Sequence, residues 1–231
     1  MMSTDRKKTG EVNRSQKWIA LAGIFVPLLY ISMVIILGLL EPGYNQRTMM
    51  MSILGGVQGW RGAAFNFGLV LIGSLLIVFG FGLHRNVNQG KGNRLGFILF
   101  VFAGIGLMGS SYYYCDVGCV NIIQEPDFRG KMHMLFAFIA GLSLAFAPLP
   151  FLFSMKHDPR WKSYSGVTLA AVILSNIPGI VMWIALFTTR LPEWEGIIQR
   201  LGLIFPLIWV EAIAIKIFST SKDEPVELIP E

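Results

Sequence analysis

Six long apolar runs, separated by short polar segments, constrain how this chain can fold. Each run is close to the roughly 20 apolar residues that an α-helix needs to cross a bilayer. In lipid, backbone polar groups must be satisfied within the protein, which limits spanning structures to helices and closed barrels. The runs therefore predict an all-α membrane protein with a bundle of six transmembrane helices, over residues 18–40, 65–83, 95–113, 132–154, 165–187 and 197–218.

The low share of charged residues supports this interpretation. Only 14% of the 231 residues are charged, against about 25% in an average soluble domain. The first run follows a basic segment, but it is longer than the roughly 7–15-residue core of a signal peptide and lacks a small-residue cleavage site. We therefore expect a multi-pass protein of the cell membrane, with one domain over residues 18–218 and polar tails at 1–17 and 219–231.

The distribution of basic residues predicts the orientation in the membrane. Six spans place both termini on one side, and the side richer in Lys and Arg faces the cytoplasm. Thirteen of the 19 basic residues fall on the side of the termini. Both termini are thus predicted cytoplasmic, and the loop after the third span extracytoplasmic. The formal charge of +5 is spread over the ends of spans, which indicates contact with membrane lipids and no nucleic-acid binding.

The loop after the third span contains both cysteines, Cys115 and Cys119. We expect a disulfide, because oxidising compartments preserve such bridges and Gly118 permits the tight turn that brings the two residues together. Three alternatives stay open: a metal site with Asp116 or His133, a redox-active pair, and two separate thiols. No second Cys pair and no paired His accompany them, so we predict neither a metal nor a cofactor.

Polar residues at the predicted outer ends of the spans form a candidate site. Asp116, His133 and Arg200 are the catalytic candidates, since an imidazole titrates near neutrality and carboxylates can orient it. The candidate binding residues near them are Tyr44, Asn45, Ser52 and Asp127. The alternative is a solvated loop, in which Asp forms turns through local hydrogen bonds.

Two polar residues lie deep in the predicted spans, Asn176 in the fifth and Glu211 in the sixth. An ionisable group inside a membrane is by default a functional hypothesis. Glu211 is about two helical turns from the predicted cytoplasmic end. It is therefore either a structural anchor, which could pair with Lys216, or a binding site for a proton or ligand.

The third span contains a glycine pattern that resembles a nucleotide-binding motif. Residues 104–109 spell G-x-G-x-x-G, but that motif indicates dinucleotide binding only between a strand and a helix. Inside a span, small residues let two helix backbones approach closely. We therefore expect these glycines to pack against neighbouring helices.

Four short elements resemble a known membrane family. Residues 44–55, with Tyr-Asn and then Met-Ser-Ile-Leu-Gly, resemble its "YN…ISELG" element, and Cys-Asp-Val-Gly-Cys at 115–119 resembles its "CDPGC" element. Residues 130–133 resemble the "G…H" start of its fourth helix, and residues 196–209 its "G…QRL…W" sixth helix. The family is the prokaryotic one called domain of unknown function 998, and the resemblance covers nearly the whole chain in order.

The resemblance implies a six-helix membrane fold and no particular activity. The chain departs from the family pattern at Val117, where proline is expected, and at residues 53–54, where no acid is present. Two functions follow as hypotheses. The first is a lipid-interacting, assembly or sensory module with a disulfide-locked outer loop, acting alone, as a homo-oligomer or with a membrane-protein partner. The second is a membrane enzyme or small-solute carrier that uses the Asp, His and Arg site.

Overall fold

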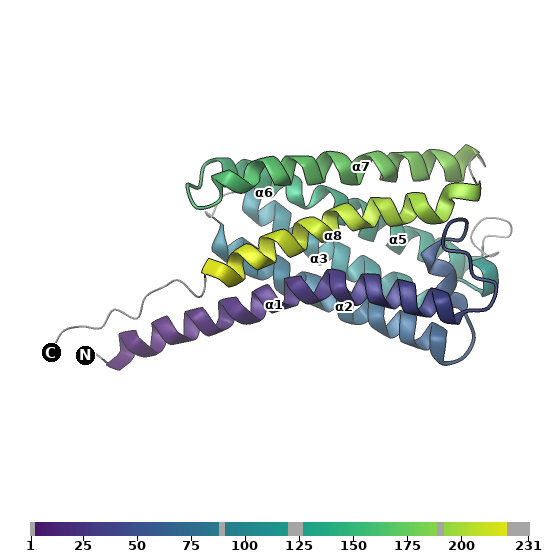
Figure 1. Cartoon of the computed structure of the whole chain (residues 1–231), viewed down its shortest axis with the longest axis horizontal. Helices are drawn as coiled ribbons and strands as arrows, with labels where there is room; N and C mark the ends of the chain where they lie inside the picture. The colour runs from purple at the N-terminus through teal and green to yellow at the C-terminus, as the bar shows by residue number, and fades with distance from the viewer. Residues whose placement is uncertain (1–2, 88–90, 120–126, 189–191, 221–231) are drawn as a thin grey trace.

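The computed structural model describes residues 3–87, 91–119, 127–188 and 192–220, and within them all regular structure is helical (Figure 1). Six segments are long and apolar enough to span a membrane, as the sequence predicts. The helices are α1 (Ser3–Leu40), α2 (Trp60–Asn86), α3 (Lys91–Tyr112), α5 (Phe128–Phe146), α6 (Pro148–Lys156), α7 (Ser165–Thr188) and α8 (Glu195–Thr220). Short 3-10 turns connect them: η1 (Met51–Gly56), η2 (Val117–Cys119), η3 (Lys162–Tyr164) and η4 (Pro192–Trp194).

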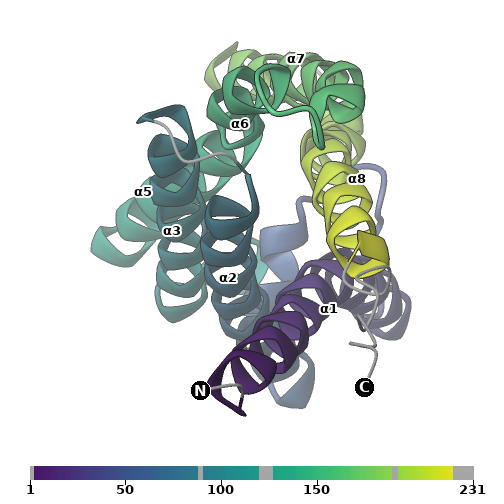
Figure 2. The same cartoon turned by 90° about the vertical axis from the view of Figure 1, so that its left-hand side faces the viewer.

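The spans form a ring when the bundle is viewed from one end (Figure 2). Going round it, α1 packs on α2, α2 on α3 and α3 on both α5 and α6, while α6 packs on α7, α7 on α8 and α8 again on α1. The start of α1 and the end of α8 lie at the same end of the bundle (Figure 1). At the opposite end lie η1, η2 and the starts of α2, α5 and α8.

The fourth span consists of two helices, where the sequence predicts one helix over 132–154. α5 ends at Phe146, and α6 begins at Pro148 after the junction residue Ala147. Proline lacks a backbone N–H and its ring displaces the preceding turn, so Pro148 and Pro150 favour the start of a new helix over the continuation of the old one.

The segment between the predicted first and second spans, residues 41–64, folds back into the bundle. α2 already begins at Trp60, and η1 lies inside the ring (Figure 2). Met51 and Leu54 of η1 are each 2% exposed and belong to the main core. Irregular backbone at membrane depth is tolerated only where protein surrounds it. This condition is met here, because side chains from α2 and α8 satisfy the backbone of η1.

The glycines of α2 and α3 mediate close helix packing, as predicted. A Cβ on Gly104 would lie 2.5 Å from the Gly73 carbonyl oxygen of α2, and one on Gly106 would lie 2.6 Å from the Ala140 nitrogen of α5. Gly109 packs against the ring of Phe136 in the same way. The G-x-G-x-x-G pattern is therefore a packing surface for two neighbouring helices.

A cluster of aromatic side chains fills the half of the helix bundle that lies nearer the chain ends. Phe100 stacks on Trp209 with 6.2 Å between ring centroids, and Phe79 and Phe151 pack on Phe100. The Trp209 Nε1–H donates to Thr168 Oγ1 at 2.9 Å, so the buried indole is hydrogen bonded. This half of the bundle is a close-packed core.

Candidate functional site

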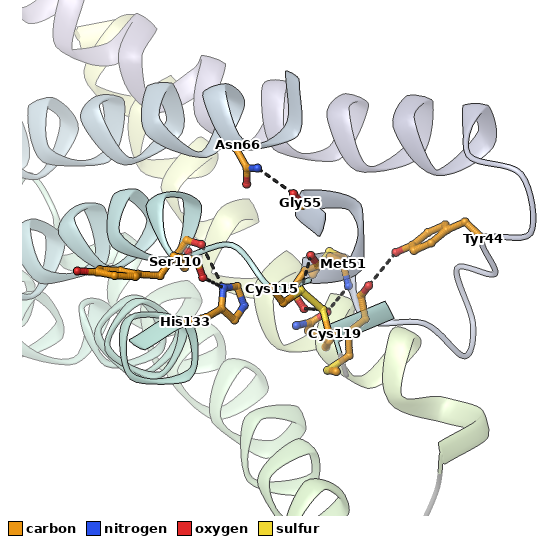
Figure 3. The surroundings of a disulfide bond; sticks show 12 residues. Tyr44, Met51, Gly55, Asn66, Ser110, Cys115, Cys119 and His133 are labelled. Atoms are coloured by element: carbon orange, nitrogen blue, oxygen red, sulfur yellow. Dashed lines mark hydrogen bonds between the residues drawn. A yellow bond between two sulfur atoms is a disulfide. The ribbon is translucent and has the colours of Figure 1, made fainter. Parts of the chain in front are cut away.

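A disulfide joins Cys115 and Cys119, as the sequence predicts, with 4.9 Å between their Cα atoms. Both residues are buried and pack on η1: Cys115 Sγ lies 3.2 Å from the Ser52 carbonyl oxygen, and the Ser52 hydroxyl lies 3.8 Å from Cys119 Sγ. Gly118 adopts φ 76°, which lets the chain turn between the two sulfurs. The bridge thus fixes residues 115–119 against η1 (Figure 3).

The close approach of the two segments depends on Gly56. A Cβ there would lie 2.6 Å from the Cys115 carbonyl oxygen and would also meet that of Asp116. Among the residues that the structure describes, no three His, Cys, Asp or Glu side chains lie together as metal ligands would.

Arg200 is engaged by the backbone of the segment that precedes η1. Its Nη1 donates to the carbonyl oxygens of Gln46 at 2.6 Å, Met49 at 3.2 Å and Gly196 at 2.8 Å. Its Nη2 donates to the Tyr44 hydroxyl at 2.7 Å. The guanidinium therefore holds residues 44–49 on the start of α8.

Tyr44 completes this arrangement. Its hydroxyl accepts from Arg200 and donates to the Met50 carbonyl oxygen at 3.2 Å. Burial raises the pKa of the phenol, and the charge of Arg200 offsets part of that effect. Tyr44 thus remains a neutral donor at physiological pH, which the bond to Met50 requires.

The remaining candidate residues serve local structure or lie apart. Asn45 accepts from the backbone N–H of Arg47 at 2.9 Å, which forms a turn, and Asp127 caps α5 by accepting from Gly130 at 2.6 Å. Asp116 is exposed beside the disulfide. No ion pair joins the described residues Lys216 and Glu211, and the Nζ of Lys216 lies over the ring of Tyr164, 5.8 Å from the centroid.

A cavity of about 720 Å³ occupies the half of the ring nearer the disulfide. Its walls come from η1, α2, α3, α5, α7 and α8, with Tyr30 of α1. Of the three catalytic candidates, only His133 lines it, together with the predicted binding residue Ser52. None of the lining residues is Asp, Glu, Lys or Arg. On α8 the lining ends at Leu203, so the cavity does not extend to Glu211.

His133 is fixed by the end of α3. Its Nδ1 lies 3.1 Å from both the Ser110 and the Tyr113 carbonyl oxygens. The residue is 5% exposed. In Figure 3 the Nδ1 edge faces Ser110, and the opposite edge of the ring points away from it.

Gln199, Asn66 and Tyr30 line the cavity and contact η1, and the sequence did not propose them as site residues. Gln199 Oε1 accepts from the Met51 N–H at 2.6 Å, Asn66 Nδ2 donates to the Gly55 carbonyl oxygen at 2.9 Å, and the Tyr30 hydroxyl donates to Met51 Sδ at 3.4 Å. The bonds from Gln199 and Asn66 satisfy backbone groups of η1, and the bond from Tyr30 holds the Met51 side chain. The signal that could have found them is the one that identified Asn176, a polar side chain in an apolar run.

The cavity opens on the side of the bundle, between α5 and α7. Its rim carries apolar side chains that are between 38% and 59% exposed: Phe138, Leu142 and Phe146 of α5, and Ile173, Ile177 and Ile180 of α7. This surface belongs to spans of the membrane bundle, so lipid is the surrounding medium. The cavity therefore opens sideways, toward the bilayer.

Comparison with known proteins identifies a family. No curated protein and no solved structure matches the chain. A family model matches residues 24–216, which include all six spans in whole or in large part, the disulfide loop and the cavity. The chain therefore belongs to the family described as "Protein of unknown function (DUF998)".

Proposed function

We propose that this protein is a lipid-interacting membrane module that binds a single lipid in the cavity beside its disulfide-locked loop. The lipid enters between α5 and α7. One of its chains lies along the apolar wall, and its head group lies near His133. The observation that carries this proposal is the cavity itself, which is apolar, free of charged side chains and open at the rim between these two helices.

The size and lining of the cavity support this function. Its volume of about 720 Å³ falls within the roughly 300–1,000 Å³ that small-molecule sites span, and such sites combine apolar walls with a few polar groups. Ser52, His133 and Gln199 line the cavity on the side of the disulfide, whereas Asn176 lines it farther along α7. An amphipathic ligand could place its head group beside the first three residues. An enzyme or carrier built on Asp116, His133 and Arg200 has less support, because Arg200 is bound by backbone carbonyls and Asp116 does not line the cavity.

Filling the cavity tests this function. Gly141 and Gly202 line it, and a Cβ on either meets nothing closer than 3.7 Å. We expect Gly141→Leu and Gly202→Leu each to reduce co-purified lipid at least about tenfold, because the new side chain occupies the volume of the ligand and tenfold requires only about 1.4 kcal/mol. Native mass spectrometry of protein extracted in mild detergent measures the bound lipid.

Gly166→Leu is the matched control. Gly166 lies on α7, is exposed, and a Cβ there has nothing within 4 Å, but the residue does not line the cavity. This variant should keep the wild-type amount of lipid. If the two cavity variants are folded and retain as much lipid as Gly166→Leu does, the proposed function is wrong.

We place the disulfide end of the bundle on the extracytoplasmic side, from the excess of basic residues at the other end. Gln58 is exposed just before α2, and Ser163 is exposed in η3, just before α7. The starts of α2 and α7 lie at opposite ends of the bundle (Figure 1). In intact cells, a thiol reagent that cannot cross membranes should label Gln58→Cys and should label Ser163→Cys only after the cells are broken. The reverse labelling pattern would mean that the disulfide end of the bundle faces the cytoplasm.

A further inference from the structure

We infer that the cavity selects an uncharged lipid whose head group carries a hydroxyl, and that this hydroxyl donates a hydrogen bond to Nε2 of His133. The inference rests on the proposed function, because it names the class of lipid that the cavity binds. It depends on three features of the cavity lining: the tautomer of His133, the unused hydrogen-bond donor of Gln199, and the absence of formal charge.

The hydrogen bonds of His133 determine its tautomer. Carbonyl oxygens only accept hydrogen bonds, so the Nδ1 that lies 3.1 Å from two of them must carry the proton. In the neutral ring, Nε2 is then left as an acceptor. No described residue donates to it, and His133 lines the cavity. A ligand with a hydroxyl can supply the missing donor.

Two further residues of the cavity lining have unused hydrogen-bonding capacity. Gln199 Oε1 accepts a hydrogen bond from the Met51 N–H, and the Nε2 amide group is a donor with no partner among the described residues. Asn66 Nδ2 donates to the Gly55 carbonyl oxygen, and Asn66 Oδ1 is buried without a hydrogen-bond partner. Both residues line the cavity. Protein atoms cover Asn66 Oδ1, so a ligand in the cavity does not reach it. A head group that combines a hydroxyl with ester or amide carbonyls could donate to His133 and accept from Gln199.

The lack of charge in the lining excludes an ionised head group. A phosphate or carboxylate drawn into this cavity would lose its hydration and meet no Lys or Arg in return, and an unpaired charge in such surroundings is strongly disfavoured. Arg200 does not serve this purpose, since it does not line the cavity and its Nη atoms are bound to Tyr44 and to backbone carbonyls. An uncharged head group avoids this cost.

Three photoreactive probes with identical acyl chains test the inference: diacylglycerol, its O-methyl ether and phosphatidic acid. Each carries a diazirine on one chain and is presented in phosphatidylcholine nanodiscs that contain the wild-type protein. We expect diacylglycerol to label peptides of α5 and α7 at least about tenfold more than phosphatidic acid. The methyl ether lacks the hydroxyl donor and should label roughly two- to tenfold less than diacylglycerol.

Two variants of His133 assign the hydroxyl to its acceptor. His133→Asn keeps an amide N–H where Nδ1–H was but removes the acceptor, so it should lower diacylglycerol labelling to the level of the methyl ether. His133→Gln places an amide oxygen near the position of Nε2 and should keep the preference for diacylglycerol over its ether. Circular dichroism and gel filtration establish that both variants are folded.

The possible results separate this inference from the proposed function. Equal labelling by diacylglycerol and phosphatidic acid would overturn the inference but leave a lipid-binding cavity. Unchanged labelling in a folded His133→Asn protein would also overturn it. If no probe labels α5 or α7 in the wild-type protein, the proposed function fails as well.

Discussion

Arg200→Met is expected to release the segment before η1 and to destabilise the whole protein. The change leaves the carbonyl oxygens of Gln46 and Met49 and the hydroxyl of Tyr44 without their charged donor. Arg200 is partly buried, and each acceptor left without a donor in such a site costs about 1–3 kcal/mol. Three such acceptors together cost about 3–5 kcal/mol when each loss is near the lower end of that range. We therefore expect the apparent unfolding temperature in detergent to fall by roughly 6–20 °C.

Arg200→Met should loosen the segment around η1 under conditions in which the rest of the protein is still folded. Hydrogen exchange at the Met51 amide, which donates to the side chain of Gln199 on the same turn of α8, should accelerate in Arg200→Met. Arg200→Lys is the matched control: it keeps the charge but cannot bind several acceptors in the planar geometry of a guanidinium. The stability of Arg200→Lys should therefore lie between that of the wild-type protein and that of Arg200→Met. Wild-type stability in Arg200→Met would show that this residue does not hold the segment.

Gly106→Leu should separate α3 from α5 and prevent normal folding. The first atom of the new side chain would already lie 2.6 Å from the backbone nitrogen and 2.8 Å from the Cα of Ala140. Backbone atoms inside a helix cannot yield as a flexible side chain can, so the helices must move apart along their contact. We expect a loss of about 3 kcal/mol or more, measured as a lower unfolding temperature and a lower yield of monodisperse protein.

The same substitution at Gly166 provides the comparison. A Cβ at Gly166 has nothing within 4 Å, so Gly166→Leu should change the free energy of unfolding by no more than about 0.5 kcal/mol. A similar loss at both positions would mean that leucine disfavours these helices for a reason other than packing. Equal tolerance at both would contradict the packing role of the G-x-G-x-x-G pattern.

The spans, the disulfide and the packing glycines could be predicted from the sequence because each depends on local or compositional physics. A run of about 20 apolar residues is costly to leave in water and long enough to span lipid. Cys115 and Cys119 are four residues apart, and Gly118 supplies the turn between them. Glycines inside a span indicate close backbone contact without specifying the partner.

The candidate site was predicted only in part. Residues at the outer ends of spans were expected to converge, and Ser52 and His133 do line one cavity. Arg200 lies near the start of α8, as His133 lies near the start of α5. Its side chain, however, points into the backbone of residues 44–49. Sequence position places a residue at a given depth in the membrane. It does not determine which face of the helix points inward, because that depends on neighbours distant in the chain.

The sequence by itself determined the number and type of the spans and the chemistry available at their outer ends. Only the tertiary structure decided that η1 enters the ring, that its backbone is satisfied by Gln199 and Asn66, and that a cavity without charge remains beside it. The physical reason is that apolar periodicity reports transfer from water to lipid, whereas a cavity and its hydrogen bonds arise from contacts between helices. Residues 51 and 199 are 148 positions apart, and no local pattern records their contact.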